Sequence, residues 1–442
     1  MALYVKKFGG SSVATPEKML NIANRVLRDR KPGDKIVIVV SAMGDSTDDL
    51  LDLAAKVSDV NYARERDMLL STGEQVSIAL MAMTFKKLGV PAISLTGPQA
   101  GIVAGGGYGK ATIDDVKPDR VFKELEAGNI AVSYTHLTLP TTPYVDDVKP
   151  DRVFKELEAG NIVIVAGFQG MMPNGDIATL GRGGSDATAV ALAGAMHADM
   201  CEIFTDVDGV YSADPRHVTG TIKMKEITNT EMLEMARLGA GVMQPRSVEL
   251  GMKYHIPIHV RSTFTDEEGT IIREVCTMET RDDTVRGVAQ DAHAARIAVL
   301  GLRNIPGVAY KIFSVLAENN ITVDMIVQSV RNSNDDKTDI IFTIDDADLS
   351  DAKRVLDAMR DEGKVEEVIY DDDTAKVSVV GAGMLGRPGV AARMFGALGR
   401  AGVNIDIVST SEISISCLIL RKDLDKAVQA IHDEFFTAGE GR

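Results

Sequence analysis

The chain of 442 residues contains no tryptophan, and only 5% of its residues are aromatic. Its three cysteines, Cys201, Cys276 and Cys417, are far apart, so their spacing matches neither a disulfide framework nor a zinc site. Basic residues are outnumbered, with 48 lysines and arginines against 64 acidic residues and a net charge of −16. Because nucleic-acid-binding proteins concentrate basic residues, no nucleic-acid partner is expected. The few scattered cysteines fit a reducing, cytoplasmic compartment.

Long hydrophobic runs are also missing. No stretch approaches the ~18 consecutive apolar residues that predict a membrane-spanning helix, and the N-terminal segment becomes glycine-rich before a signal-peptide core is complete. Export and membrane spanning are therefore not expected. With 45% hydrophobic and 25% charged residues, the composition is that of a globular protein. The length suggests roughly two to four domains.

Up to about residue 265, short runs rich in valine and isoleucine alternate with longer amphipathic stretches. The clearest strand-like runs are 36–40, 92–95 and 163–166, and the longest helix-like stretch is 69–88. Continuous apolar strands that alternate with helices are typical of a parallel sheet covered on both faces. We therefore predict an α/β domain over residues 1–285, with an open, mostly parallel sheet between helices.

A diverged repeat follows this domain. Residues 297–329 resemble residues 377–411, and Pro306 and Asp324 recur as Pro388 and Asp406, in both cases 82 residues later. This spacing predicts two sibling domains, at 286–370 and 371–442. Each is expected to contain a strand, a loop, a helix that starts at the proline, and a second strand.

A second repeat is of another kind, because residues 114–130 recur letter for letter at 146–162. The segment between the copies is rich in threonine and proline and has no periodicity. We interpret residues 131–162 as a cloning or sequence-assembly scar; the alternative is a genuine tandem duplication of one helix. Looping out a segment of this length costs only a few kcal/mol, so the fold is expected to tolerate it.

The first candidate motif is a strand that ends in Gly9-Gly10-Ser11-Ser12 and precedes Thr15-Pro16, a plausible helix start. Glycines let backbone N–H groups approach phosphate oxygens, and Lys7 is placed to neutralise a transferring phosphoryl group. No Walker sequence occurs. Taken alone, these residues fit a simple tight turn equally well.

The second candidate motif is residues 179–186, in which Arg182, Ser185 and Asp186 lie among glycines at the start of a small-residue helix. Arginine suits bidentate binding of a carboxylate, to which Ser185 is placed to donate. Asp186 is suited to order Lys7 or a metal ion. These residues predict an anion-binding site.

The third candidate motif, residues 204–216, ends a strand with acids, an aromatic residue and a cation. Thr205 and Asp206 are suited to hold a nucleotide, and Arg216 its phosphates. An ordinary Asp-Gly turn with a solvated arginine is the alternative.

Five motifs in this order resemble those of aspartate kinases in the amino-acid kinase superfamily: KFGGSS, SAMGDSTDDL, LLSTGEQ, TLGRGGSD and TDVDGVYSADPR. The similarity covers nearly the whole chain apart from residues 131–162. The diverged repeats resemble ACT domains, which are small ferredoxin-like modules that pair their sheets and bind amino acids. The resemblance implies an amino-acid kinase fold followed by two ACT domains.

By this resemblance Lys7 and Asp186 are catalytic, Lys7 steadying the phosphoryl group and Asp186 organising the centre. The ATP-binding positions are Lys7, Phe8, Gly9, Gly10, Ser11, Thr205, Asp206, Tyr211, Arg216, Gly241 and Val242. The substrate-binding positions are Ser41, Thr47, Glu74, Arg182 and Ser185, with Glu74 at the α-amino end of aspartate. The effector positions are Asn304, Gln328, Asn404, Ile405 and Glu412. No residue is assigned as a metal ligand.

One departure from the family pattern concerns Gly239-Ala240-Gly241-Val242. Many members carry Gly-Ala-Lys-Val there. A backbone contact to the nucleotide is retained as the expectation, and a lysine contact is not.

The implied reaction is in-line attack of the L-aspartate β-carboxylate on the γ-phosphate of ATP, accompanied by Mg²⁺. A carboxylate is already ionised, so no general base is expected, and catalysis reduces to positioning two anions. The resemblance further implies the first step of lysine, threonine and methionine biosynthesis, with lysine, threonine or both as effectors and a homo-oligomer joined through the ACT domains. The alternatives are a kinase for acetylglutamate or a nucleoside monophosphate, and a non-catalytic amino-acid sensor.

Overall fold

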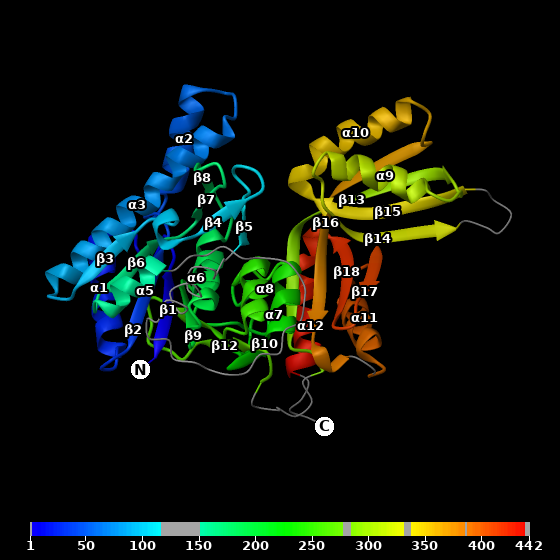
Figure 1. Cartoon of the computed structure of the whole chain (residues 1–442). Helices are drawn as coiled ribbons and strands as arrows, with labels where there is room; N and C mark the ends of the chain where they lie inside the picture. The colour runs from blue at the N-terminus through cyan, green and yellow to red at the C-terminus, as the bar shows by residue number, and fades with distance from the viewer. Residues whose placement is uncertain (1, 116–150, 277–283, 331–336, 385–386, 438–442) are drawn as a thin grey trace, which may run out of the picture. The chain divides into compact units, whose positions relative to one another are not determined.

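The computed structural model describes residues 2–115, 151–276, 284–330, 337–384 and 387–437. It divides the chain into two compact units (Figure 1). The first unit comprises residues 1–210, 223–233 and 242–279, and the second comprises 211–222, 234–241 and 280–442. The predicted boundaries at 285 and 370 stay predictions.

The first unit is built on an eight-stranded sheet with the order β10-β12-β11-β9-β1-β2-β6-β3. All its pairings are parallel except that of β11 with β12. In chain order its strands are β1 (Leu3–Phe8), β2 (Lys35–Val40), β3 (Ala92–Leu95), β6 (Ile162–Ala166), β9 (Met200–Thr205), β10 (Glu226–Thr228), β11 (Ile258–Ser262) and β12 (Thr270–Arg273).

The two faces of this sheet bury different residues. Alternate side chains, such as Ile36, Ile38 and Val40 of β2, pack against α1 (Pro16–Asp29) and α3 (Ala63–Lys87) in one apolar core. The small-residue helix α6 (Gly184–Ala195) packs against β1, β2 and β9. Successive residues of a strand point to opposite faces, so neighbours in β1 lie in different environments. The remaining helices are α2 (Ser46–Val57), α5 (Asp151–Glu158), α7 (Asn229–Arg237), α8 (Pro245–Tyr254) and the 3-10 turn Pro98–Ala100.

A smaller sheet in the same unit has the order β5-β4-β7-β8. Its strands are β4 (Val103–Gly105), β5 (Thr112–Asp115), β7 (Gln169–Met171) and β8 (Ile177–Thr179). The second copy of the exact repeat forms α5, a turn at Gly160 with φ of 83°, and the start of β6. The first copy, from residue 116 on, and the segment between the copies lie outside the described residues.

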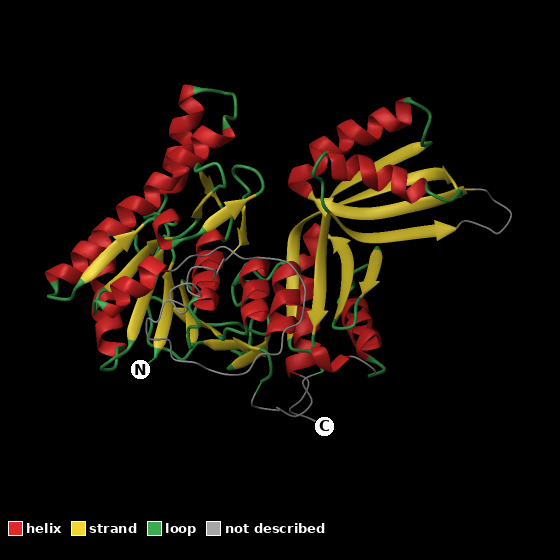
Figure 2. Ribbon diagram, viewed as in Figure 1, coloured by secondary structure: helices red, strands yellow, loops and turns green. Residues whose placement is uncertain are grey.

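The second unit contains a six-stranded antiparallel sheet, β14-β15-β13-β16-β18-β17, with β13 and β16 paired at its centre. Figure 2 shows these long strands in yellow. Its strands are β13 (Gly287–Arg303), β14 (Val323–Val330), β15 (Lys337–Asp345), β16 (Glu367–Val380), β17 (Ile407–Thr410) and β18 (Ser414–Leu420). Its helices are α9 (Val308–Glu318), α10 (Leu349–Asp361), α11 (Val390–Arg400) and α12 (Leu424–His432), with short 3-10 turns at Asp346–Asp348, Ala382–Met384 and Arg421–Asp423 and a π-helical turn at Asp433–Thr437.

The helices of the diverged repeat do not start at their prolines, and this prediction was wrong. Pro306 and Pro388 each lie two residues before the helix. The cap positions are held by Gly307 and Gly389, with φ of 90° and 101°. Glycine adopts these positive angles without the strain that a side chain would bring, so the Pro-Gly pair makes the turn before the helix.

Helix α3 is, among the described residues, the one helix whose length and apolar composition would let it cross a membrane. Half of its most apolar window is buried inside the protein. The helix also buries two acidic side chains, Asp67 and Glu74. A core helix that is buried inside a folded domain can have the same length and apolar composition.

Candidate active site

A cavity of about 370 Å³ opens where β1 and β2 end and α6 begins. Ligands of α/β proteins commonly bind at the carboxyl ends of parallel strands. Eight predicted site residues line this cavity: Lys7, Gly10, Ser41, Thr47, Glu74, Arg182, Ser185 and Asp186. The other lining residues are Ala42, Gly44, Phe168, Gly181, Gly183, Gly184 and Gln244.

The ammonium of Lys7 and the carboxylate of Asp186 form an ion pair in the cavity wall, with Nζ 2.5 Å from Oδ1. Their side chains are only 11% and 13% exposed. Lys7 points to the α6 face of the sheet, and Asp186 lies in the first turn of α6, where the helix dipole favours negative charge. Asp186 therefore fixes the position of an ammonium that faces the cavity.

The glycine loop after β1 folds as a tight turn onto α1. The carbonyl of Gly9 accepts from the N–H groups of Ser12 and Val13 at 3.0 and 3.2 Å. A Cβ on Gly10 would lie 2.9 Å from the Ala42 carbonyl oxygen, so this close approach requires glycine. Thr15 caps α1 by accepting from the Lys18 N–H at 3.3 Å, and Pro16 is the first helical residue. The predicted helix start is confirmed.

Glu74 is 2% exposed and its Oε1 accepts from the Ala42 N–H at 3.1 Å. Its other carboxylate oxygen is buried without a hydrogen-bond partner in the described structure. Burial raises the pKa of Glu74 to about 7, although its hydrogen bonds to backbone N–H groups act in the opposite direction. A bound ammonium would supply the partner that this carboxylate lacks.

On the opposite wall, the hydroxyl of Ser41 donates to the hydroxyl of Ser185 at 2.9 Å. Arg182 is exposed and borders the cavity, while Ser185 is buried at the start of α6. The cavity thus combines two cationic side chains with two acidic ones. This arrangement can hold a zwitterion and an approaching anion.

The predicted nucleotide positions have varied surroundings. Phe8 is fully buried and stacks on Phe204 with ring centroids 4.6 Å apart, so only its backbone is free to meet a ligand. Ser11 is exposed, and its carbonyl accepts from Lys18 Nζ at 2.9 Å. Thr205 donates to the exposed Asp206 at 3.0 Å. Val242 is half-buried in the same unit.

Three more predicted nucleotide positions, Tyr211, Arg216 and Gly241, belong to the second unit. The Arg216 guanidinium is bound to the carboxylate of Asp214 at 2.6 Å. That interaction holds the pKa of the Asp214 carboxyl below its usual range. Their roles as nucleotide contacts stay predictions.

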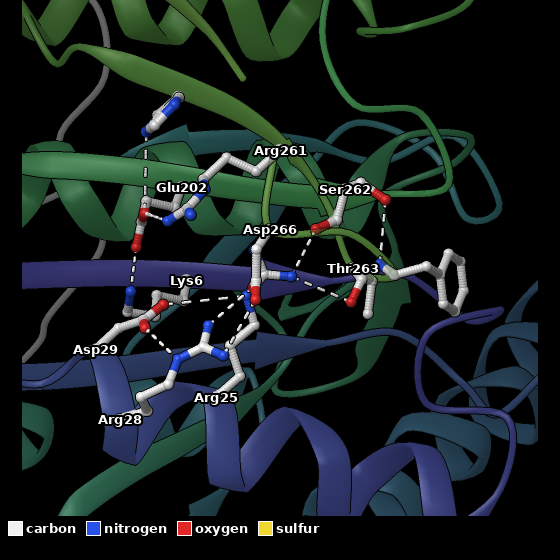
Figure 3. A network of polar contacts seen from close by, with 11 residues as sticks. Lys6, Arg25, Arg28, Asp29, Glu202, Arg261, Ser262, Thr263 and Asp266 are labelled. Atoms are coloured by element: carbon white, nitrogen blue, oxygen red, sulfur yellow. Dashed lines mark hydrogen bonds and ion pairs between the residues drawn. The ribbon is translucent and has the colours of Figure 1, made fainter. Parts of the chain in front are cut away.

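The face of the sheet opposite Lys7 holds a buried charge network (Figure 3). Lys6 pairs with Glu202, to which Arg261 also donates at 2.9 Å. Glu202 is strongly buried, but the neighbouring cations Lys6 and Arg261 outweigh that desolvation and hold its pKa below the usual value. The cationic groups of Lys6 and Arg261 also lie 5.8 and 5.4 Å from the centroid of the Phe204 ring.

Arg25 of α1 extends this network to the strand ends. Its Nη1 donates to the carbonyls of Ser262 and Thr263 at 2.8 and 3.1 Å (Figure 3). The Thr263 hydroxyl lies 2.7 Å from that of Ser12, next to the glycine loop. Arg25 therefore supports the loop predicted to hold ATP, and no local sequence pattern had indicated this role.

The predicted effector positions all lie in the second unit. Asn304, Asn404 and Glu412 are exposed, and Ile405 packs against the core of the second repeat. Gln328 donates to the Thr338 hydroxyl at 3.2 Å. Their binding roles stay predictions.

Phe168 and Gln244 line the cavity but were missed in the sequence. Phe168 has a φ of 65°, unusual for a residue with a bulky side chain. Gln244 lies against Gly183, where a Cβ would collide with its side chain. Neither residue belongs to a motif that indicates chemistry.

Comparison with known proteins assigns this architecture. The amino acid kinase family model matches residues 2–262, and an ACT domain model matches 297–359 and 377–435. An aspartokinase of Mycolicibacterium smegmatis is 45% identical over 442 residues, covering 100% of this chain and 97% of that protein. Aspartokinase 2 of Bacillus subtilis is 43% identical, covering 98% of each. The chain belongs to the aspartokinases of the amino acid kinase family.

Solved structures agree with this assignment. An aspartate kinase from Synechocystis is 41% identical with a TM-score of 0.51, covering 98% of this chain and 69% of that one. Aspartokinase III of E. coli, solved with aspartate and ADP, is 24% identical with a TM-score of 0.74, covering 98% and 100%, and supports the fold alone. The predictions of an amino-acid kinase fold, ACT domains and a kinase that phosphorylates a carboxyl group are confirmed.

Proposed function

We propose that this enzyme transfers the γ-phosphoryl group of ATP to the β-carboxylate of L-aspartate and so forms 4-phospho-L-aspartate. The carrying observation is the Lys7–Asp186 ion pair in the wall of a cavity that also presents Glu74 and Arg182. Aspartate brings an ammonium group and two carboxylates. The cavity offers acidic groups for the ammonium and cationic groups for the carboxylates.

In this proposal Glu74 and Thr47 hold the amino-acid end, and Arg182 and Ser185 bind a carboxylate. Lys7 steadies the phosphoryl group, and Asp186 keeps the Lys7 ammonium in place. Two anions must approach each other in this reaction. Fixed positive charge beside the transferring phosphoryl group therefore lowers the barrier most. The nucleophile is already ionised, so no side chain has to remove a proton.

ATP would lie along the glycine loop, with backbone contacts from Phe8, Gly9, Gly10 and Ser11 and side chains from Thr205 and Asp206. Tyr211, Arg216, Gly241 and Val242 complete the proposed nucleotide set. Within the described ranges, no group of three or more histidine, cysteine or acidic side chains gathers to hold a metal ion. Mg²⁺ would bind the ATP phosphates and offset their charge, and Asp186 is an acidic group in the cavity wall that could help to order it.

The paired repeats support a regulatory role. An E. coli aspartokinase III structure is described as a complex with lysine and aspartate. We propose that lysine, threonine or both inhibit this enzyme as end products of a pathway that begins with aspartyl phosphate. The binding positions would be Asn304, Gln328, Asn404, Ile405 and Glu412. We also propose a homo-oligomer joined through the ACT domains and a cytoplasmic location.

A hydroxamate assay tests this proposal directly, because hydroxylamine traps acyl phosphates. The enzyme is supplied with ATP, Mg²⁺ and either aspartate or N-acetylglutamate, with and without lysine and threonine. A nucleoside monophosphate forms no acyl phosphate, so with this acceptor the release of ADP is measured instead. We expect hydroxamate only when aspartate is the acceptor. Less of it should form when lysine or threonine is added. No aspartate-dependent product would defeat the substrate assignment.

A further inference from the structure

Helix α3 places two buried acids on one face, two helical turns apart. Glu74 lines the cavity, whereas Asp67 does not. Asp67 is 0% exposed, so its carboxylate is cut off from water. A carboxylate in such a place is retained only where hydrogen bonds satisfy it.

Three donors meet the Asp67 carboxylate. Oδ2 accepts from the N–H groups of Gly109 and Thr179 at 2.8 and 2.9 Å. Oδ1 accepts from the Thr179 hydroxyl at 2.8 Å. Thr179 is the last residue of β8 and stands three residues before Arg182, so Asp67 holds the base of the Arg182 loop.

The same carboxylate also fixes the neighbouring loop between β4 and β5. From that loop the Ala111 N–H donates to the Thr179 carbonyl at 3.1 Å. Gly181, with a φ of 71°, lies beside this loop, since a Cβ there would be in ordinary van der Waals contact with the Gly109 carbonyl oxygen, at 3.6 Å. The β4–β5 loop and the Arg182 loop are thus clamped together, with Asp67 as the shared acceptor.

We propose that Asp67 is a positioning residue for aspartate binding, which fixes the Arg182 loop relative to Glu74 on the same helix. The inference rests on the proposed function, in which Glu74 and Arg182 hold opposite charges of the amino acid. Bound charges must be held to a fraction of an ångström for tight binding. Neither Asp67 nor Thr179 needs to touch the substrate.

The test compares variants of the full-length enzyme by their KM values for the two substrates. Because Asp67→Ala removes all three acceptor contacts, we expect the KM for aspartate to rise about tenfold or more and the KM for ATP to stay within about twofold. Ser77→Ala is the matched control, since Ser77 is buried on the same helix and its hydroxyl bonds, among the described residues, only to the Gly73 carbonyl of its own helix. It should leave both KM values unchanged.

Asp67→Asn separates hydrogen-bond geometry from charge. Its amide oxygen can accept both N–H groups while its NH₂ donates to the Thr179 hydroxyl, which can also act as an acceptor. We therefore expect Asn to restore most of the affinity for aspartate. An Asn variant as impaired as the Ala variant, or an Ala variant with a normal KM for aspartate, would overturn the inference.

Two further variants complete the design. If Asp67→Ala does not fold, Thr179→Val decides, because it removes only the hydroxyl contact: a raised KM for aspartate supports the inference and an unchanged one overturns it. Arg182→Ala tests the underlying site. A normal KM for aspartate in Arg182→Ala refutes the proposed site itself, whereas a raised KM there with a normal Asp67→Ala refutes only the role of Asp67.

Discussion

Asp324 of the first repeat forms an ion pair with Lys376, which precedes the second repeat by one residue. The relationship is reciprocal, because Asp406 of the second repeat pairs with Arg296, which precedes the first repeat, at 3.2 Å. The two aspartates are the equivalent residues of the duplication. Each repeat therefore contributes a carboxylate that pairs with the cation immediately before the other repeat.

These two ion pairs should differ in their contribution to stability. The Lys376 side chain is 6% exposed, and without Asp324 its remaining carboxylate is that of Asp291 at 3.9 Å. Lys376 is buried but the Asp324 side chain is 53% exposed, so Asp324→Asn should lower the free energy of unfolding by about 2 kcal/mol, less than the loss of a fully buried pair. Arg296 is 30% exposed and keeps Asp371 as a partner, so Asp406→Asn should cost less than about 1 kcal/mol. Urea unfolding of the full chain measures both; equal effects would contradict this reasoning.

Lys7→Ala should lower the turnover rate about a thousandfold while it changes both KM values only a few-fold. The Lys7 ammonium is proposed to act on charge that moves during phosphoryl transfer, so its loss affects the transition state more than the bound substrates. Steady-state kinetics checks this split. Lys56→Ala on the exposed face of α2 is the control. A Lys7→Ala enzyme with normal turnover would exclude the role.

The pKa of Glu74 predicts how stability depends on pH. Burial raises this pKa from 4.5 to about 7, so between these values the folded state holds a proton that the unfolded state has released. The free energy of unfolding should therefore fall as pH rises from about 4.5 to 7, by at most about 3 kcal/mol. Glu74→Gln should remove this slope. Unfolding measured at pH 5 and pH 8 for both proteins tests it, and identical slopes would contradict it.

The same carboxyl predicts a pH effect on substrate binding. In the proposed site an ionised Glu74 pairs with the aspartate ammonium, so the KM for aspartate should rise as pH falls below about 7. Glu74→Gln should have a higher KM with a much weaker pH dependence. Because both proteins use the same ATP, titration of the nucleotide affects them alike. A parent enzyme whose KM is constant from pH 6 to 8 would rule out this role.

Removal of residues 131–162 should give a more stable enzyme that is at least as active. Since the two copies are identical, the product has the same sequence as a chain lacking residues 114–145. It therefore retains the residues that form α5 and start β6. Without a long loop to close, the free energy of unfolding should rise by a few kcal/mol at most. Thermal unfolding and the hydroxamate assay test this, and a product that does not fold would refute the scar interpretation.

Local sequence patterns predicted the parts of the fold that depend on local chemistry. The strand Ala92–Leu95 and the start of α1 at Thr15 and Pro16 were placed correctly. Periodicity and capping are short-range signals. The Pro-Gly pairs were misread because proline commonly opens a helix, whereas here the following glycine makes a turn first.

Supporting contacts between distant segments were not predictable in this way. Asp67 and Thr179 are 112 residues apart, and Arg25 reaches a carbonyl 238 residues away. Nothing near Asp67 distinguishes it from an exposed acid on a helix. Motifs indicated most of the polar residues that line the cavity, but the contacts that hold these residues in place depend on which strands lie side by side.

The adjacent lysines of β1 have a consequence for strand pairing. Lys7 faces Asp186 and the cavity, while Lys6 faces Glu202 on the opposite side of the sheet. A slip of β1 by one residue that brings Phe8 to the place of Lys7 at the cavity would also move Lys7 to the opposite side of the sheet, into the place of Lys6 beside Glu202. Asp186 would then face an aromatic ring in place of its ammonium partner, and the stack of Phe8 on Phe204 would be lost. This misregistered strand is thus disfavoured, and the native register keeps the Lys7 ammonium on the cavity side of the sheet.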